Sequence, residues 1–253
     1  MMMPELTKCT LSGNFGARLA ELARTKITDL SVQGCGLVPD AFSALAQCKN
    51  LTRLNLKSTR TTDADVAKLA VLEGLDGLTL SATRVTLEGL RALKSLRKLH
   101  RFSWSFTPGK GTEELGEIAR LFPQITVFEI FSVAATEADI AAFGTFRELT
   151  RLEFNDNKIT DDAIRGIGAV KRLQSVRLSY RASITDVGLG YIAAHKGITE
   201  VICTEAADIT DAGILKLAKM NQLKRLEIAN CEKLTPAGFA AFQKARPDVT
   251  LAK

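Results

Sequence analysis

The residues whose types suit catalysis or metal binding are the cysteines and the two histidines. The cysteines are Cys9, Cys35, Cys48, Cys203 and Cys231. They form no C-x-x-C pair and have no neighbouring histidine to complete a zinc site, so we interpret them as reduced structural thiols. His100 and His195 stand far apart in the sequence, and neither lies beside a cysteine or serine set in a nucleophile motif. We therefore predict that the protein is not an enzyme and uses no metal or cofactor.

One short string, GKGT at Gly109–Thr112, invites a phosphate-binding interpretation. It lacks the G-x-x-x-x-G-K-S/T spacing in which backbone amides surround a phosphate group. The string also follows Pro108 and lengthens the segment in which it lies, so a bulged turn before a helix explains it better. We place Trp104, shortly before this turn, in the core.

Composition and charge place the chain among ordinary globular proteins. It has 253 residues, of which 46% are hydrophobic and 25% charged, and a formal net charge of +6. The positive charge is modest and spread over the chain, which is weak evidence for a nucleic-acid partner. No apolar run approaches the ~20 residues that span a bilayer, and the first residues lack the pattern of a secretory signal. We expect a cytoplasmic protein that makes no membrane contact.

A repeated sequence pattern predicts the strands and helices that carry the residues named above. Between Leu149 and Arg172, apolar residues and Asn157 follow L-x-x-L-x-L-x-x-N-x-I, and the residues from Thr160 on are typical of a capped helix. Aligned on the first apolar residue of this pattern, the units begin at Leu6, Ile27, Leu51, Leu75, Leu99, Ile125, Leu149, Leu173, Ile198 and Leu223. Successive starts are 21 to 26 residues apart, so ten units cover nearly the whole chain.

Stacking of these units predicts the fold class. Each unit supplies a strand and then a helix, and a single unit cannot bury its own apolar side, so the units must stack into an α/β solenoid. Parallel strands lie ~4.8 Å apart whereas neighbouring helices need roughly 8 to 10 Å, so the stack curves toward the strands. We therefore predict a right-handed horseshoe with a concave parallel sheet and convex helices. It forms a single domain over residues 1–253, with an N-terminal cap repeat in 1–26 and a closing strand in 247–253.

Several motifs indicate the type of repeat. Cys35 stands at the ninth position of the second unit. The string I-T-D begins at Ile159, Ile184 and Ile209, and N-C-E-K-L-T-P-A-G occupies residues 230–238. In these features the chain resembles leucine-rich repeat proteins of the cysteine-containing, ribonuclease-inhibitor-like type, as found in F-box substrate adaptors and bacterial proteins. The resemblance implies a solenoid that recognises another protein. A substrate-adaptor subunit of a larger complex is the alternative, which we favour less because no helical segment precedes the first unit to recruit a ligase.

Threonines mark the expected helix starts. A hydroxyl at this position accepts a hydrogen bond from a backbone amide of the first turn, which stabilises a helix by ~1 kcal/mol. We predict N-caps at Thr62, Thr86, Thr112, Thr136, Thr160, Thr185, Thr210 and Thr235. Further into the first turn, Asp65, Glu114 and Asp139 suit reciprocal capping boxes. The other units carry a small residue there, which we interpret as room for close packing of neighbouring helices.

The candidate binding surface is the concave face of the predicted sheet. The first, fourth and sixth positions of each unit point into the core, so the third, fifth and seventh point out of the sheet. We predict that a partner protein contacts this face and its rim. The residues in this prediction are Arg53, Lys57, Arg101, Phe106, Glu129, Phe131, Arg151, Glu153, Arg177 and Tyr180.

Alternatives remain open for the same residues. The charged members from Glu129 to Arg177 lie on adjacent strands, and they either await a partner or pair with one another, at ~1 kcal/mol or less for each exposed pair. The aromatic members either form an exposed rim of the kind found at binding hot spots, or fold inward, Phe106 over the bulge and Phe131 over its neighbour.

A basic run suggests a different function. It comprises Arg91, Lys94, Arg97, Lys98 and Arg101, with no acidic residue among them. The leucines between these cations fall at core spacing, so we interpret the cations as the solvated outer face of a helix and the turn that follows. The alternative is an anion or nucleic-acid binder that uses residues 91–101 with Arg53 and Lys57, and its affinity would fall steeply with salt. We favour the protein partner and expect a monomer.

Overall fold

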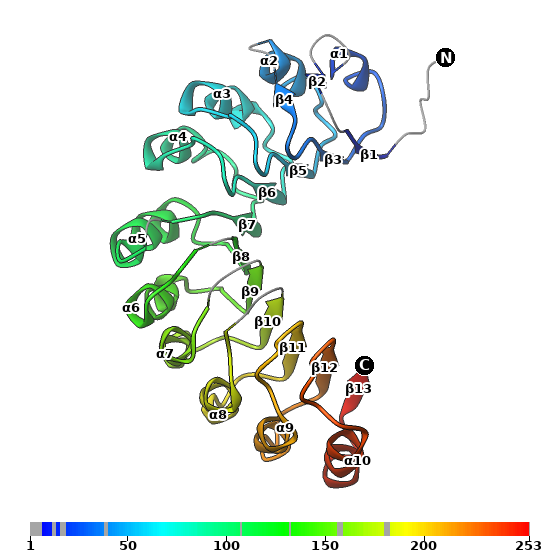
Figure 1. The fold of residues 1–253 in the computed structure, drawn as a ribbon. Helices are drawn as coiled ribbons and strands as arrows, with labels where there is room; N and C mark the ends of the chain where they lie inside the picture. The colour runs from blue at the N-terminus through cyan, green and yellow to red at the C-terminus, as the bar shows by residue number, and fades with distance from the viewer. Residues whose placement is uncertain are drawn as a thin grey trace. The chain divides into compact units, whose positions relative to one another are not determined.

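The computed structural model describes residues 7–11, 14–15, 19–37, 40–106, 108–131, 133–155, 159–179 and 183–252. Strands and helices alternate along these residues (Figure 1). The chain divides into two compact units: unit 1 comprises residues 1–105 and 117–125, and unit 2 comprises residues 106–116 and 126–253. The helix α5 (Gly111–Leu121) contributes residues to both.

The described part of unit 1 contains a parallel sheet, a small strand pair and short helices. The strands of the sheet, each hydrogen-bonded to the next, are β1 (Lys8–Thr10), β3 (Asp29–Ser31), β5 (Arg53–Asn55), β6 (Gly77–Thr79) and β7 (Arg101–Ser103). The separate parallel pair consists of β2 (Asn14–Phe15) and β4 (Gly36–Leu37). The helical segments are α1 (Leu19–Leu22), α2 (Ala41–Leu45), α3 (Asp63–Ala67), the 3-10 helix η1 (Lys68–Val71) and α4 (Leu87–Ala92).

The described part of unit 2 repeats the same alternation with longer strands. Its parallel strands, in spatial and sequence order, are β8 (Val127–Phe131), β9 (Arg151–Asn155), β10 (Ser175–Ser179), β11 (Glu200–Thr204), β12 (Arg225–Ala229) and β13 (Thr250–Ala252). Its helical segments are α6 (Glu137–Ala141), η2 (Ala142–Thr145), α7 (Asp161–Ile164), η3 (Arg165–Ala169), α8 (Asp186–Ala194), α9 (Asp211–Leu217) and α10 (Pro236–Ala245). The strand expected within 247–253 is β13, which pairs with β12.

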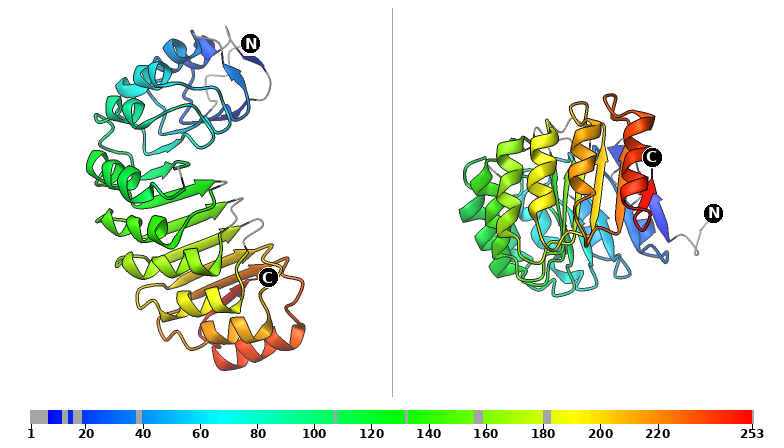
Figure 2. Two further views of the ribbon diagram at one scale, coloured as in Figure 1. Left: turned by 60° about the vertical axis from the view of Figure 1, so that its left-hand side comes forward. Right: turned by 90° about the horizontal axis from the view of Figure 1, so that it is seen from below.

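In each unit the helices lie on one side of the strands (Figures 1 and 2). Among the described residues, no helix covers the other side of either sheet. We call this uncovered side the open face. The third, fifth and seventh positions of each repeat lie on it, because successive side chains of a strand point to opposite faces.

The leucine pattern decides which side of each strand is buried. Leu149, Leu152 and Phe154, at the first, fourth and sixth positions of their repeat, are at most 1% exposed. Complete burial of side chains of this size contributes roughly 1.5 to 3 kcal/mol each. Trp104 is 6% exposed and stacks on Phe102, as expected for a core residue.

Threonines cap the helices as predicted, with one exception. A first-turn backbone amide donates to the hydroxyl oxygen of Thr62, Thr86, Thr136, Thr160, Thr185, Thr210 and Thr235. Complete capping boxes form at Asp65 and Asp139. Thr112 is instead the second residue of α5, so the N-cap predicted there, and its capping box with Glu114, are wrong. The reason is the Asp139 carboxylate, which accepts hydrogen bonds from the amides of Gly109 and Gly111 at 2.9 and 2.8 Å and so fixes an earlier helix start.

The glycines in the first helical turn have a specific cause. The Asp161 carboxylate accepts hydrogen bonds from the amide and hydroxyl of Thr185 and from the amide of Gly188, at 2.9, 2.6 and 2.9 Å. A Cβ atom on Gly188 would lie 2.3 Å from that carboxylate. The same bridge to the threonine of the next repeat recurs at Asp63–Thr86, Asp186–Thr210 and Asp211–Thr235. These glycines therefore make room for a carboxylate that links consecutive repeats, and not simply for a neighbouring helix.

Candidate functional site

The open face of unit 2 is organised around the carboxylate of Glu200, at the third position of its repeat. Arg151 donates to it from β9, with Nη2 3.0 Å from Oε2, and Arg225 donates from β12, with Nη1 3.0 Å from Oε1. Ser175, on the strand between β9 and β11, donates its hydroxyl at 2.5 Å. The strand register aligns these four residues across the sheet. Glu200 is thus held from both sides by the chain's own cations.

The surroundings of Glu200 keep it ionised. Burial by itself would raise the pKa of this carboxyl group, but the Ser175 hydrogen bond and the charges of Arg151 and Arg225 outweigh burial and lower the pKa. The carboxylate is therefore negative at neutral pH. Its two arginines are engaged within the chain, which fixes their side chains in place.

A second set of ion pairs surrounds Glu153 at the fifth position of its repeat. Its carboxylate lies 3.8 Å from Arg151 Nη1 and 3.9 Å from Arg177 Nε, and the residue is only 9% exposed. The internal pairing of Arg151, Glu153 and Arg177 is therefore confirmed. Glu129, the fourth member of the expected ladder, lies beside Glu153 in the register of β8 and β9.

Three charged residues of this network were not in the predicted binding set: Glu200, Arg225 and Glu227. Arg225 Nη2 also donates to Glu227, at 2.5 Å. The signal was present in the sequence, because all three occupy third or fifth positions of their repeats. What the sequence does not reveal is that Arg151 reaches past Ser175 to a strand two places away.

The open face of unit 1 carries cations with fewer carboxylates of its own. Lys8 Nζ and Arg53 Nη1 lie 3.6 and 3.8 Å from the same oxygen of Asp29. On the next strand, Gly77 aligns with Arg53 on one side and Arg101 on the other. A Cβ atom on Gly77 would lie 3.4 Å from Arg53 Cγ and 3.8 Å from Arg101 Cβ and Cδ. Gly77 is buried although it has no side chain, because the stems of the two arginines lie against it.

Short polar side chains fill much of the remaining open face of unit 1. The hydroxyls of Ser81 and Ser103 lie 2.6 Å apart and are buried. Asn55 donates to the side-chain oxygen of Gln33 at 3.2 Å and accepts from the backbone amide of Lys57 at 2.9 Å. The long charged side chains of this open face are therefore mainly cationic.

The expected aromatic rim is only partly present. Phe106 is 3% exposed and packs edge to face against Phe143, with ring centroids 6.1 Å apart, so its placement on an exposed rim is wrong. The inserted turn leaves the ring free to enter the core of unit 2. Phe131 is half-buried at the seventh position of its repeat. Tyr180 lies outside the described residues.

The basic run is divided between the helix side and the open face of unit 1, since Arg91 lies in α4 and Arg101 in β7. Leu90, Leu93 and Leu96 are fully buried, as the interpretation of a solvated outer helix face requires. Arg91 donates to Glu88 at 2.8 Å and to Glu117 at 3.2 Å, and these hydrogen bonds raise its pKa. At least this arginine of the run is engaged with carboxylates of the chain.

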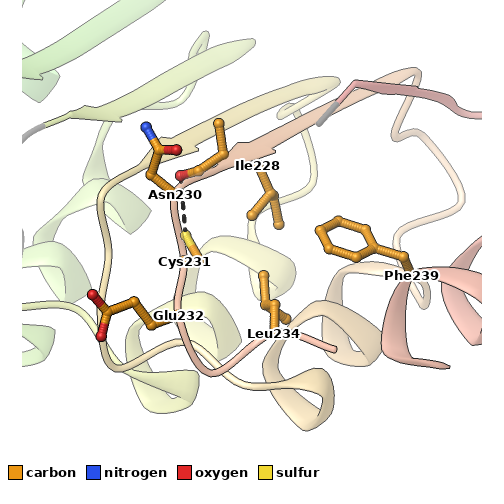
Figure 3. Close-up of a pocket in the computed structure, with 7 residues that line it drawn as sticks. Ile228, Asn230, Cys231, Glu232, Leu234 and Phe239 are labelled. Carbon is orange, nitrogen blue, oxygen red and sulfur yellow. Dashed lines mark hydrogen bonds between the residues drawn. The ribbon is translucent and has the colours of Figure 1, made fainter. Parts of the chain in front are cut away.

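A hollow of about 610 Å³ with a mixed polar and apolar lining lies at the end of β12 (Figure 3). Ile228, Leu234 and Phe239 face it, and the Cys231 thiol, which donates to the Ala229 carbonyl at 3.5 Å, lies at its edge. Burial raises the pKa of the Cys231 thiol, so the group is neutral at pH 7. A neutral thiol is a poor nucleophile.

A second hollow, of about 340 Å³, lies on the helix side at the ends of η3 and α8. Arg165 and Lys171 line it, but Arg165 is paired with Glu137 and Lys171 donates to a helix-end carbonyl at 3.0 Å. His195 contacts backbone groups through both ring nitrogens at 3.1 Å, and burial lowers its pKa, so the ring is neutral. Lys171 and His195 therefore form hydrogen bonds with backbone groups at the ends of helical segments.

Two classes of site find no support among the residues that the structure describes. No group of three or more His, Cys, Asp or Glu side chains is placed to hold a metal ion. None of the helices in the described ranges has the length and apolar character needed to cross a membrane.

Comparison with known proteins agrees with the repeat pattern. A family model described as leucine-rich repeat matches residues 147–168. A search of curated protein sequences finds no match. Among solved structures, an internalin from Listeria monocytogenes is similar, with a TM-score of 0.51 and 16% identity over 92% of this chain. A leucine-rich repeat protein from Leptospira interrogans has a TM-score of 0.45 and 17% identity, also over 92% of this chain.

The similarity to the internalin bears on the fold. The chain spans 63% of the length of the internalin chain and 56% of that of the Leptospira chain. With the alternating parallel strands and helices described above, the internalin alignment confirms the predicted α/β leucine-rich repeat fold.

Proposed function

We propose that the protein binds another protein through the open faces of its sheets, without catalysis. The observation that carries this proposal is the row of fixed charged side chains on an uncovered sheet, above all Glu200 held between Arg151 and Arg225. Side chains that are already ordered lose little freedom on binding, which favours recognition. Leucine-rich repeat solenoids as a class use such extended sheet surfaces for binding.

The proposed contact surface keeps most of the residues expected from the sequence. It comprises Arg53, Lys57, Arg101, Glu129, Phe131, Arg151, Glu153 and Arg177. We leave out Phe106 because it is buried. Tyr180, which lies outside the described residues, stays a predicted member of the surface. Phe131 is the half-buried aromatic member of the surface, and large aromatic residues and arginines are the types that dominate binding hot spots.

Affinity purification from the native host's lysate tests the proposal if bulky side chains block one face at a time. Thr79→Arg and Ala229→Arg place an arginine on the open face of unit 1 and unit 2. Val71→Arg and Val187→Arg place the same residue on the helix side, at positions that are each 52% exposed. All four variants add one positive charge, so charge alone does not separate them.

We expect wild type and the helix-side variants to retain the same protein partner, and at least one open-face variant to lose it. Retention by both open-face variants would contradict the proposal. So would the capture of nucleic acid that elutes as salt rises and is unaffected by either open-face variant, since that result would favour the basic run.

We also propose the cysteine-containing repeat type and a reducing, cytoplasmic location. All five cysteines are free thiols, and the Cys35 sulfur donates to the carbonyl of Leu11 in the preceding repeat at 3.2 Å. Reduced thiols persist in the cytosol. Mass spectrometry after alkylation without reductant should find five modified cysteines, and a disulfide in protein from the native host would contradict this assignment.

A further inference from the structure

We propose that His195 makes unit 2 sensitive to mild acid: a second proton on its ring breaks the turn that joins α8 to β11 and loosens the start of that strand. The two elements follow each other in the chain, α8 on the helix side and β11 in the sheet (Figure 1). The proposal does not depend on the proposed function. Its evidence is the way in which the two ring nitrogens are bonded.

Hydrogen bonds to the backbone determine which ring nitrogen carries the proton. The amide of Gly197 donates to His195 Nδ1 at 3.1 Å, so this nitrogen is an acceptor and carries no proton. In the neutral ring the proton is therefore on Nε2, which donates to the carbonyl of Val170 at 3.1 Å. Both nitrogens of the neutral ring are thus bonded, one within the turn and one to the preceding repeat.

A protonated ring cannot keep both hydrogen bonds. In the imidazolium ion both nitrogens are donors, so the new proton on Nδ1 would face the N–H of Gly197. Two donors cannot share a hydrogen bond, and the Gly197 amide would lose its acceptor. The bond from Nε2 to Val170 would remain, and the positive charge would strengthen it. The effect of the proton therefore falls on the turn at Gly197.

Burial and charge both favour the neutral ring. His195 is 8% exposed. Burial lowers the pKa of His195, and the charge of Lys171 lowers it further, while the bond to Val170 acts in the opposite direction. The folded pKa is therefore below the unfolded value of ~6.5. The resulting stability is fully present above ~6.5 and is lost as the pH falls from there through the folded pKa.

The charged groups around the ring do not offset an added positive charge. The hollow beside the ring is lined by three cationic residues and a tyrosine: Arg165, Lys171, Lys196 and Tyr191. Among the described residues, its lining includes no carboxylate. Glu137, from the preceding repeat, is paired with Arg165. From the following repeat the contact is the uncharged side chain of Gln222, which donates to the His195 carbonyl at 2.8 Å.

The turn at Gly197 leads directly into the strand that carries the Glu200 carboxylate. Two residues, Ile198 and Thr199, separate the glycine from β11. The amides of Thr199 and Glu200 donate to the Gln174 carbonyl at 2.8 and 3.0 Å, which holds the start of β11 against the preceding repeat. Loss of the bond at Gly197 therefore removes a constraint at the point where β11 begins.

NMR spectroscopy tests the proposal at the ring itself, because His100 and His195 are the two histidines of the chain. His100→Gln leaves one set of imidazole signals, so this measurement needs no change at His195. The ring nitrogen shifts at about pH 8 should show the Nε2–H tautomer, and the ring should titrate below ~6.5. An Nδ1–H tautomer, or a titration midpoint above ~6.5, would overturn the proposal.

Amide hydrogen exchange locates the effect in the chain. After correction for the intrinsic exchange rate, protection of the Gly197 and Glu200 amides should fall at least about threefold between about pH 7.5 and about pH 5.5. The Arg97 amide, which donates to the Ser95 carbonyl at 2.8 Å in a turn of unit 1, is the internal control and should keep its protection. Unchanged protection at Gly197, or an equal loss at Arg97, would contradict a local effect of His195.

Thermal unfolding of matched variants gives an independent readout. His195→Gln keeps one donor and one acceptor in the side chain but does not titrate. Between about pH 7.5 and about pH 5.5, wild type should lose about 2 to 4 °C more of its melting temperature than His195→Gln. His100→Gln removes the exposed histidine and should lose at least as much as wild type. Equal losses for wild type and His195→Gln would overturn the proposal.

Discussion

The open faces of the two units carry arginines at the same position of the repeat but use them differently. In unit 2, Arg151 and Arg225 close on the carboxylate of Glu200. In unit 1, Arg53 and Arg101 stand on either side of Gly77. Since the repeat and the register are alike, the difference comes from the residue between the arginines. In unit 2 the scaffold directs these cations toward a carboxylate of the same chain.

The two faces differ in the exposure of their arginines and not in burial as a whole. Ile202 and Ser179 of unit 2 are 1% and 4% exposed, and Ser81 and Ser103 of unit 1 are 0% and 1% exposed. The Arg53 side chain in unit 1 remains 60% exposed. The Arg151 and Arg225 side chains, which pair with Glu200 in unit 2, are 36% and 44% exposed.

The largest expected effect on stability comes from comparing two glycines. Packing requires a glycine at position 188, but not at position 77. Gly188→Ala should destabilise the protein by about 2 to 3 kcal/mol, because the new methyl group displaces the Asp161 carboxylate from its hydrogen bonds. Gly77→Ala should be neutral or stabilise by up to ~1 kcal/mol, because glycine weakens a strand. Urea unfolding measures both. A loss for Gly77→Ala as large as that for Gly188→Ala would contradict this difference in packing.

The next largest effect is expected from removing the Glu200 carboxylate on the open face of unit 2. Glu200→Ala should destabilise by about 1 to 2 kcal/mol, because it leaves Arg151 and Arg225 close together without their carboxylate. Glu227→Ala, which removes a carboxylate bonded to Arg225 alone among the described pairs, should cost less, ~0.5 kcal/mol. Equal losses in urea unfolding would contradict the central position of Glu200.

A smaller effect follows from the pKa of Glu200. Burial raises this pKa, but Ser175 and the two arginines lower it further than burial raises it, so it is below the unfolded value. The resulting stabilisation is present above the unfolded pKa of ~4.3 and is lost as the pH falls through the folded pKa. Between about pH 5 and pH 3, wild type should lose more stability than Glu200→Gln. Parallel stability-versus-pH curves for the two proteins would contradict this assignment.

The fold was predictable because burial follows directly from spacing in a repeat. The positions of Leu152 and Phe154 required burial, and threonines at the helix starts acted as caps. Thr112 failed because the group that fixes the start of α5 is Asp139, which belongs to another repeat. The bridge from Asp161 to Thr185 was missed for the same reason. Its signal was an aspartate at one helix start followed, one repeat later, by a glycine in the first turn.

The candidate site was predictable in composition but not in pairing. Arg53 and Arg101 were recognised from their third positions, yet their common neighbour Gly77 acquires meaning only when the register sets the three residues side by side. For Phe106, the sequence did not predict even whether the side chain is buried or exposed. It follows the strand, where alternation no longer determines direction, and the ring of Phe143 decides that it is buried.

The decisive comparison is between the open faces and the helix side as binding surfaces. After circular dichroism verifies folding, the affinity of the partner captured from host lysate should be measured for Thr79→Arg and Ala229→Arg, and for the helix-side controls Val71→Arg and Val187→Arg. We predict about a tenfold loss for at least one open-face variant and no loss for either helix-side variant. Unchanged affinity in both open-face variants, or an equal loss in the helix-side variants, would contradict recognition through the open faces.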